Sequence, residues 1–225
     1  MITTVFFDLD HTLWDFEKNS EKAFDTIFRL KHQNINTSAF IEKYIPINQA
    51  CWKLYQNDKI THEELRYNRL KHSFDALNYA ISDLEINQMA DDYIHFLPEN
   101  NYLFDGAIEI LDYLSSKYQL HIITNGFAEV QYKKIKNSKI DGYFQSITNS
   151  EMAGAKKPNP IIFEHALSKA NAKKENTIMI GDCLDADVGG ALNFGIDAIF
   201  FNPYNIEVQN SIKQVKHLLE IKKHL

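Results

Sequence analysis

Short apolar runs separated by longer amphipathic segments dominate the hydrophobic pattern of this chain. The first run, from Ile2 to Phe7, is rich in β-branched and aromatic residues and ends at Asp8. Similar runs extend from Leu120 to Ile123, from Thr177 to Ile180 and from Ala198 to Phe201, each followed by a polar residue or glycine. Apolar runs of this length are typical of buried parallel strands. We therefore expect these four runs to be strands of a parallel sheet.

The segments between the later strands have the period of helices. Apolar residues recur at helical spacing from Ala107 to Leu114 and again from Ile162 to Ala170. Asn159 followed by Pro160 supplies a helix N-cap and a first-turn proline, and Gly195 supplies a helix stop. This alternation of strands and helices predicts an α/β fold with a doubly wound parallel sheet.

The segment from Asp15 to Leu97 interrupts this alternation. It shows several amphipathic helices in succession and no convincing strand, and the turn-rich sequence 98–101 closes it. We therefore expect a helical domain inserted into the α/β core. The predicted boundaries are residues 1–14 and 98–225 for the core and residues 15–97 for the inserted, all-helical domain.

Two helix starts inside the insertion are marked by capping boxes. Thr61 with Glu64, and Ser82 with Glu85, have the spacing at which each side chain bonds the backbone N–H of the other residue. Pro46 lies in another amphipathic stretch. Because proline has no backbone N–H to donate, we expect the helix to be interrupted there.

Composition and charge exclude several classes of protein. The formal net charge is −6 and the isoelectric point is about 5.8, whereas nucleic-acid-binding domains carry a basic excess. No apolar stretch near the N-terminus has the length or flanks of a signal peptide or a membrane span, and the two cysteines are expected to be reduced thiols. We expect a cytoplasmic enzyme, monomeric or homodimeric, with no nucleic-acid or membrane partner.

The basic stretch 216–225 is expected to form a solvated final helix, with a membrane-surface helix as the alternative.

Two carboxylates follow the first predicted strand. Asp8, Asp10 and Thr12 lie where the carboxyl ends of parallel strands form a ligand crevice. A pair of acids at this place indicates metal or phosphoryl chemistry. The alternative is a simple turn in which Asp10 or Thr12 caps the next helix.

Further polar residues follow the later strands. Thr124, Asn125 and Gly126 emerge at the same edge of the sheet as Asp8 and are able to surround an anion, although these residue types are also common in ordinary turns. Lys157, with Lys156 as the alternative, precedes a helix in a proline-restricted segment and is able to supply a positive charge.

The last polar group is an acidic cluster. Asp182 ends the strand that contains Ile180, and Asp185 and Asp187 follow at the start of a helix. Acids at a helix N-terminus also stabilise the helix dipole, so any of the three is a candidate for a purely structural role. We assign that role to Asp185.

Taken together, these motifs resemble the haloacid dehalogenase (HAD) superfamily of phosphatases. The resemblance lies in the DxDxT sequence that starts at Asp8, in Thr124 after a strand, in the Lys-Pro pair at Lys157 and in the GDxxxxD sequence that spans 181–187. It implies a Rossmann-like α/β core, and the inserted helices are similar to the type-one cap of that superfamily. The segments 6–14, 122–127 and 54–57 with 60–61 further resemble the YjjG-like pyrimidine 5'-nucleotidases.

The resemblance implies a Mg²⁺-dependent phosphatase with an aspartyl-phosphate intermediate. Asp8 would be the nucleophile, and Asp10 would donate a proton to the leaving group and then activate water. Mg²⁺ would be held by the carboxylates of Asp8 and Asp182 and by the backbone carbonyl of Asp10.

The resemblance assigns the remaining motif residues to the transferred phosphate. Thr124, the backbone near Asn125 and Lys157 would bind it, and Asp187 would orient Lys157 or a metal-bound water.

The substrate would be a small phosphate ester, and a nucleoside 5'-monophosphate is the substrate that the subfamily implies. The helical cap is expected to close over the crevice during phosphoryl transfer.

Three other readings of the motifs are open. A sugar-phosphate phosphatase or a phosphoglucomutase of the same superfamily would use the same core. A dehalogenase would share the nucleophile but would not need Asp10 or Asp182, and a phospho-accepting signalling domain would not need a cap.

Near the start of the insertion, Trp14 and Phe16 either stack on a nucleobase or pack in the protein, and Arg69 has the same ambiguity.

Overall fold

The computed structural model describes residues 1–31 and 34–225 of the chain. It divides into two compact units, one made of Met1–Asp15 with Tyr102–Leu225 and the other made of Phe16–Asn101. Within the described residues, no helix combines the length and the apolar character that crossing a membrane requires.

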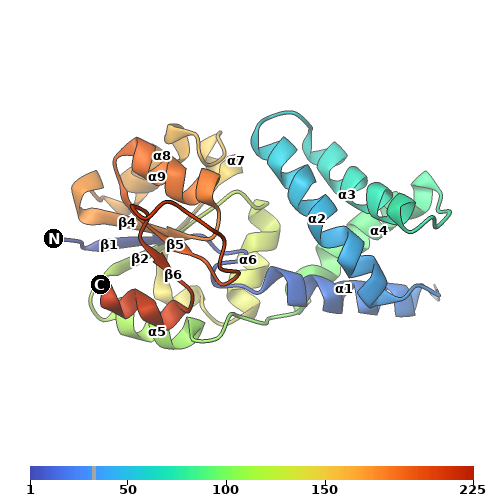
Figure 1. Cartoon of the computed structure of the whole chain (residues 1–225), viewed down its shortest axis with the longest axis horizontal. Coiled ribbons are helices and arrows are strands. Elements are labelled where there is room, and N and C mark those ends of the chain that lie inside the picture. The colour runs from blue at the N-terminus through green and yellow to red at the C-terminus, as the bar shows by residue number, and fades with distance from the viewer. Residues whose placement is uncertain (32–33) are drawn as a thin grey trace. The chain divides into compact units, whose positions relative to one another are not determined.

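A parallel sheet of six strands forms the centre of the first unit (Figure 1). Its spatial order is β3-β2-β1-β4-β5-β6, and every neighbouring pair is parallel. The strands are β1 (Thr4–Phe7), β2 (Gln119–Thr124), β3 (Phe144–Asn149), β4 (Thr177–Gly181), β5 (Asp197–Phe201) and β6 (Gln214–Val215). The predicted doubly wound α/β fold is confirmed.

Helices cover both faces of this sheet. Figure 1 shows α5 and α6 on one side of the strands and α8 and α9 on the other. The helices are α5 (Ala107–Ser115), α6 (Ala128–Asn137), α7 (Ser150–Ala153), α8 (Pro160–Ala170) and α9 (Gly190–Phe194). One apolar core joins strand residues such as Phe6 and Met179 to Phe163 and Ala166 of α8, all of them buried. Burial of these faces stabilises the layered arrangement.

The strand register decides where the chemistry lies. Phe7 at the end of β1 pairs with Ile122 in β2 and with Ile180 in β4. The residues that follow these strands therefore emerge at the same, carboxyl-terminal edge of the sheet, which is the usual ligand side of an open α/β sheet.

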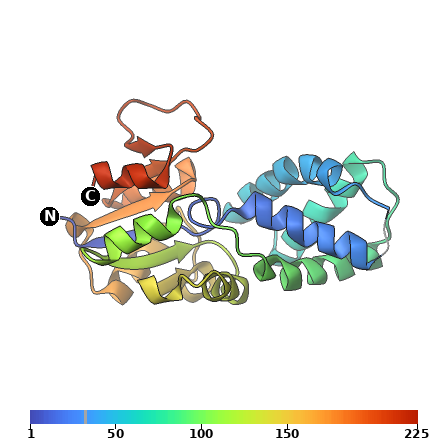
Figure 2. The same ribbon diagram turned by 90° about the horizontal axis from the view of Figure 1, so that it is seen from below.

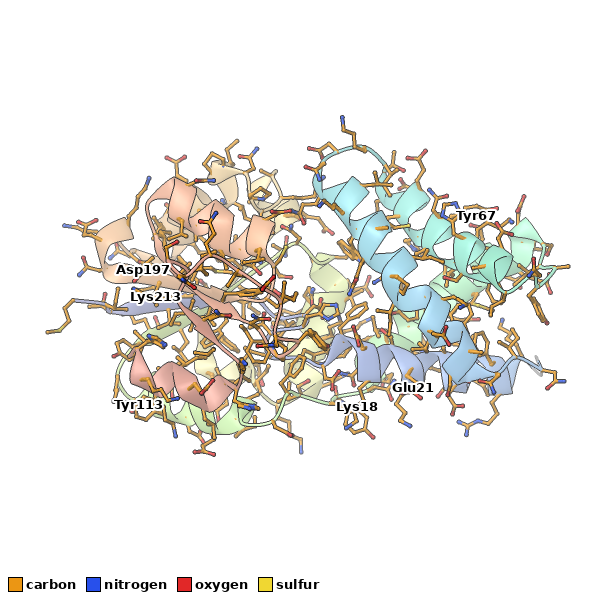
Figure 3. All side chains as sticks on the ribbon, viewed as in Figure 1. Lys18, Glu21, Tyr67, Tyr113, Asp197 and Lys213 are labelled. Atoms are coloured by element: carbon orange, nitrogen blue, oxygen red, sulfur yellow. The ribbon has the colours of Figure 1, made fainter. Side chains whose placement is uncertain are left out.

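The last residues of the chain pack against α5 within the first unit. A short 3₁₀ segment, Leu218–Lys223, buries Leu218 and Ile221 next to α5. Tyr113 of α5 donates its hydroxyl to the carbonyl of Leu225 at 3.2 Å, and an ion pair joins Asp197 of β5 to Lys213 just before β6 (Figure 3). The stretch 216–225 is thus a packed 3₁₀ turn rather than a solvated helix.

Helices make up most of the described part of the second unit. They are α1 (Phe16–Leu30), α2 (Thr37–Gln56), α3 (His62–Ala76) and α4 (Asp83–Phe96). Each packs against two others in the ring α1-α2-α3-α4, and Figure 2 shows them side by side. Aromatic rings from all four helices fill the centre, and the Phe24 ring lies 4.6 Å from that of Tyr93 and 4.7 Å from that of Phe40.

The helix starts agree with the sequence at two places, and the expectation at Pro46 is wrong. Thr61 and Ser82 both form the predicted capping boxes. Helix α2 continues through Pro46, which lies on its exposed face. Proline removes one backbone donor there, and the buried face of α2 holds the helix together.

Candidate active site

Asp8 and Lys157 form the buried centre of the site. Asp8 directly follows β1, and its backbone N–H donates to the carbonyl of Ile180 in β4 at 2.9 Å. The Lys157 ammonium donates to Oδ1 of Asp8 at 2.6 Å and to the carbonyl of Ile123 at 2.7 Å. Only 11% of the Asp8 side chain and 2% of the Lys157 side chain are exposed. Lys157 is therefore the lysine of its motif that contacts Asp8.

A second carboxylate, Asp187, contacts the same ammonium. It lies in a π-helical turn, Leu184–Gly189, and its Oδ1 is 2.6 Å from Nζ of Lys157. Its Oδ2 accepts the backbone N–H of Cys183 at 3.0 Å. A Cβ at Gly181 would lie 2.3 Å from this oxygen, so the close approach of Asp187 to the end of β4 requires glycine at 181. Asp187 is thereby fixed against Lys157.

Burial and charge shift the pKa values of these groups. Burial raises the pKa of Asp8 well above its ordinary value; Lys157 opposes this shift, whereas Asp187 and Asp182 add to it. Burial by itself lowers the pKa of Lys157, but Asp187 and Asp8 together raise it above its ordinary value. Burial, followed by repulsion from Asp187, raises the pKa of Asp182 to about 8. Burial is the largest cause of the raised pKa values of Asp8 and Asp182, and the positive charge of Lys157 offsets it only in part.

The same acids are able to hold a metal ion. Asp8, Asp182 and Asp187 each place a carboxylate oxygen within 4.8 Å of the others. Thr12 donates its hydroxyl to Oδ1 of Asp182 at 3.0 Å and so orients that carboxylate. Three ionised carboxylates and one ammonium sum to a charge of −2, and oxygen ligands suit a hard divalent cation. The residues present therefore fit a divalent metal such as Mg²⁺.

Asp10 lies at the same edge but has partners that the motifs did not reveal. Oδ1 of Asp10 accepts from Nζ of Lys134 at 2.6 Å, and Oδ2 accepts from Nε2 of Gln131 at 2.6 Å. Both donors belong to α6, and Nζ of Lys134 also lies 4.2 Å from the ring centre of Trp14. Neither residue is predicted from the sequence, because one glutamine and one of several lysines on a helix carry no distinctive signal.

Thr124 and Asn125 have different environments at the end of β2. The hydroxyl oxygen of Thr124 accepts from Nε2 of Gln131 at 3.0 Å and from the backbone N–H of Gly126 at 3.1 Å, so its proton is available to an acceptor in the site. The side chain of Asn125 donates to the carbonyl of Lys157 at 2.9 Å and accepts its backbone N–H at 2.7 Å. Asn125 therefore fixes the backbone of Lys157, a role that its position in the sequence did not indicate.

The remaining residues that the sequence offered as candidates have other environments. Asp185 is exposed in the π-helical turn. Trp14 is completely buried, and Phe16 is 6% exposed, so both rings are packed within the protein. Arg69 is buried inside the helical unit, where its Nη1 donates to Oδ1 of Asn48 at 3.4 Å.

Known proteins similar to this chain are hydrolases. The chain is 33% identical to the pyrimidine 5'-nucleotidase PynA of Streptococcus pneumoniae over 89% of its length and 84% of that protein. It is 29% identical to the pyrimidine 5'-nucleotidase YjjG of Escherichia coli, over 92% of its length and 89% of that protein. The crystal structure of the HAD-hydrolase YfnB of Bacillus subtilis, bound to magnesium, is similar to it with a TM-score of 0.89 and 27% identity, over 100% of this chain and 98% of that one.

The family assignment agrees with these similarities and with the site. The family model for haloacid dehalogenase-like hydrolases matches residues 2–195, which include every motif residue described above. The structure brings together an aspartate, a buried lysine and two further carboxylates at the carboxyl edge of a parallel sheet. The chain is a member of the haloacid dehalogenase-like hydrolase family and is therefore an enzyme.

Proposed function

We propose that this enzyme is a Mg²⁺-dependent phosphomonoesterase that hydrolyses nucleoside 5'-monophosphates with pyrimidine bases through an aspartyl-phosphate on Asp8. The observation that carries the proposal is the contact between Asp8 and Lys157, next to an acidic group that fits a divalent metal. The similarity to two pyrimidine 5'-nucleotidases, each over most of both chains, supports the class of substrate.

The charges in the site explain why it needs cations. A carboxylate that approaches a phosphate dianion at 4 Å is repelled by roughly 8 kcal/mol, if each charge pair contributes about 4 kcal/mol at an effective dielectric of 20. Lys157 supplies one positive charge next to Asp8. Asp8 and Asp182 would hold Mg²⁺ with the backbone carbonyl of Asp10, and the ion would supply further positive charge to the phosphoryl oxygens. Asp187 has both oxygens bonded within the protein, and its role would be to hold Lys157 in place.

The first half of the reaction transfers the phosphoryl group to the protein. A carboxylate oxygen of Asp8 attacks phosphorus, and the bond from phosphorus to the ester oxygen breaks. The electron pair of that bond stays on the leaving oxygen, which takes a proton from Asp10. Thr124 and the backbone near Asn125 would donate hydrogen bonds to the phosphoryl oxygens while their charge is redistributed.

The second half regenerates the enzyme. Water attacks phosphorus of the aspartyl-phosphate while Asp10, now a carboxylate, takes a proton from that water. The bond from phosphorus to Asp8 breaks, and its electron pair returns to the Asp8 carboxylate. The products are inorganic phosphate and a nucleoside.

Phosphate release from a panel of nucleoside monophosphates and sugar phosphates, each with and without Mg²⁺, tests the proposal. The wild type is compared with Asp8→Asn and with Asp185→Asn, a control that removes an exposed acid near the site. We expect turnover that requires Mg²⁺, prefers pyrimidine monophosphates, survives in Asp185→Asn and is abolished in Asp8→Asn.

Each other outcome overturns a defined part of the proposal. A preference for sugar phosphates would exclude the nucleotidase assignment and keep the mechanism. Activity of a folded Asp8→Asn variant would exclude Asp8 as the nucleophile. A single, stoichiometric release of phosphate would indicate a phospho-accepting signalling domain instead of an enzyme that turns over.

A further inference from the structure

Lys134 is a buried cation that faces the proposed acid–base residue. Helix α6 carries Lys133, Lys134 and Lys136, of which only Lys134 is buried, with 2% of its side chain exposed. Its Nζ lies 2.6 Å from Oδ1 of Asp10, a residue 124 positions away in the chain. Removal of a lysine from water is unfavourable unless a partner compensates, and the Asp10 carboxylate is such a partner.

Gln131 completes the arrangement one helical turn earlier. It is 1% exposed, and its Nε2 donates both to Oδ2 of Asp10 at 2.6 Å and to the hydroxyl oxygen of Thr124 at 3.0 Å. Residues three apart on a helix lie on one face, so Gln131 and Lys134 reach the same carboxylate side by side. A Cβ at Gly126 would lie 1.7 Å from Nε2 of Gln131, so the glycine makes room for this side chain.

The two donors define the orientation of the Asp10 carboxylate. Each of its oxygens has a donor of its own, which prevents rotation of the carboxylate about its bond to Cβ. A carboxylate has about four acceptor positions, so two bonds leave others for a transferred proton. Both donors extend from a helix, and a helix is a more rigid support than a loop.

We propose that Lys134 and Gln131 are positioning residues that hold the Asp10 carboxylate in line with the leaving-group oxygen. This inference rests on the function proposed above. Proton transfer requires the acid to lie within hydrogen-bond distance of the leaving oxygen, and small displacements lower the rate steeply. Loss of either donor therefore slows the step that protonates the leaving group.

The test compares two kinds of leaving group in the presence of Mg²⁺. A nucleoside monophosphate releases an alkoxide, which needs a proton, whereas p-nitrophenyl phosphate releases a phenolate that is stable without one. We compare kcat/KM, because it reports only the steps up to release of the leaving group and leaves out hydrolysis of the aspartyl-phosphate. The variants are Lys134→Met, Gln131→Met and Lys134→Arg, and the matched control is Lys133→Met on the exposed face of the same helix.

The expected result is a selective loss. General acid–base catalysis contributes about 10²- to 10⁴-fold, so we expect Lys134→Met and Gln131→Met to lower kcat/KM for the nucleoside monophosphate by roughly 10- to 100-fold. The value for p-nitrophenyl phosphate should fall less than about threefold, because its leaving group draws little on this contribution. Lys134→Arg should recover part of the loss, and Lys133→Met should behave as the wild type.

Other results would overturn the inference. Equal losses for both substrates would show that the residues support only the fold, and Lys134→Met activity equal to that of Lys133→Met would show that the contact with Asp10 is not used. If Lys134→Met does not fold, as judged by circular dichroism, Gln131→Met decides alone because it changes no charge. A wild type without Mg²⁺-dependent turnover would instead overturn the proposed function itself.

Discussion

The acids of the site should make the metal-free protein less stable as the pH rises. Burial and the neighbouring Asp187 raise the pKa of Asp182 to about 8 in the folded protein, against an ordinary value of 3.8. Between these two pH values the folded protein keeps a proton that the unfolded chain has released. The free energy of unfolding therefore falls with increasing pH across this window. Asp182→Asn removes the titrating group, so the free energy of unfolding of this variant should fall less steeply with pH than that of the wild type.

The size of the effect follows from the shift. A difference of about 4 pKa units corresponds to a maximum of about 6 kcal/mol at 1.36 kcal/mol per unit. From pH 6 to pH 8 the folded state loses half of its bound proton, and the wild type should lose about 2 kcal/mol relative to Asp182→Asn. This is a large fraction of the 5–15 kcal/mol that stabilises a typical domain.

Urea unfolding with a metal chelator, measured at several pH values from 6 to 8, checks this expectation. Asp185→Asn is the control, because it removes an exposed acid three residues away. Addition of Mg²⁺ should stabilise the wild type increasingly as the pH rises, because metal binding requires ionised carboxylates. The reasoning would be refuted if the free energy of unfolding of the wild type stays constant or rises relative to that of Asp182→Asn as the pH increases.

Three further substitutions test separate features. Gly126→Ala should displace Gln131, whose Nε2 lies 1.7 Å from the new Cβ position, and lower kcat/KM for nucleoside monophosphates; unchanged kinetics would contradict this. Arg69→Met should keep or raise the free energy of unfolding in urea by up to about 2 kcal/mol, because Nε and Nη2 of Arg69 have no hydrogen-bond partner among the described residues; a clear loss would argue otherwise. Ser82→Ala should cost about 1 kcal/mol in the same assay by removing the cap of α4, and an unaltered unfolding midpoint would exclude the cap as a contributor.

Local patterns in the sequence determined most of the secondary structure. Apolar runs mark β1, β2, β4 and β5, because strands buried on both faces consist mainly of apolar residues. Two strands are not predicted by such runs: β3, where Gln145 and Ser146 interrupt the apolar pattern, and β6, which has two residues. The effect of Pro46 was also beyond local reasoning, since the packing of α2 outweighs one missing hydrogen bond.

The motifs likewise determined which residues gather at the carboxyl edge of the sheet, because parallel strands place the residues that follow them on one side. Asp8, Asp182 and Asp187 lie together there, and Lys157 contacts Asp8.

The tertiary structure alone decided the partners of these residues. The bonds from Asn125 to the backbone of Lys157 and from Lys134 to Asp10 join positions 32 and 124 residues apart. Lys133 and Lys134 are neighbouring lysines that the sequence does not distinguish. Only the packing of α6 places Lys134 against Asp10 and leaves Lys133 exposed to solvent. The sequence determines which chemical groups are present along the chain. Long-range packing determines which of these groups are in contact, because such contacts depend on the whole fold and not on neighbours in the chain.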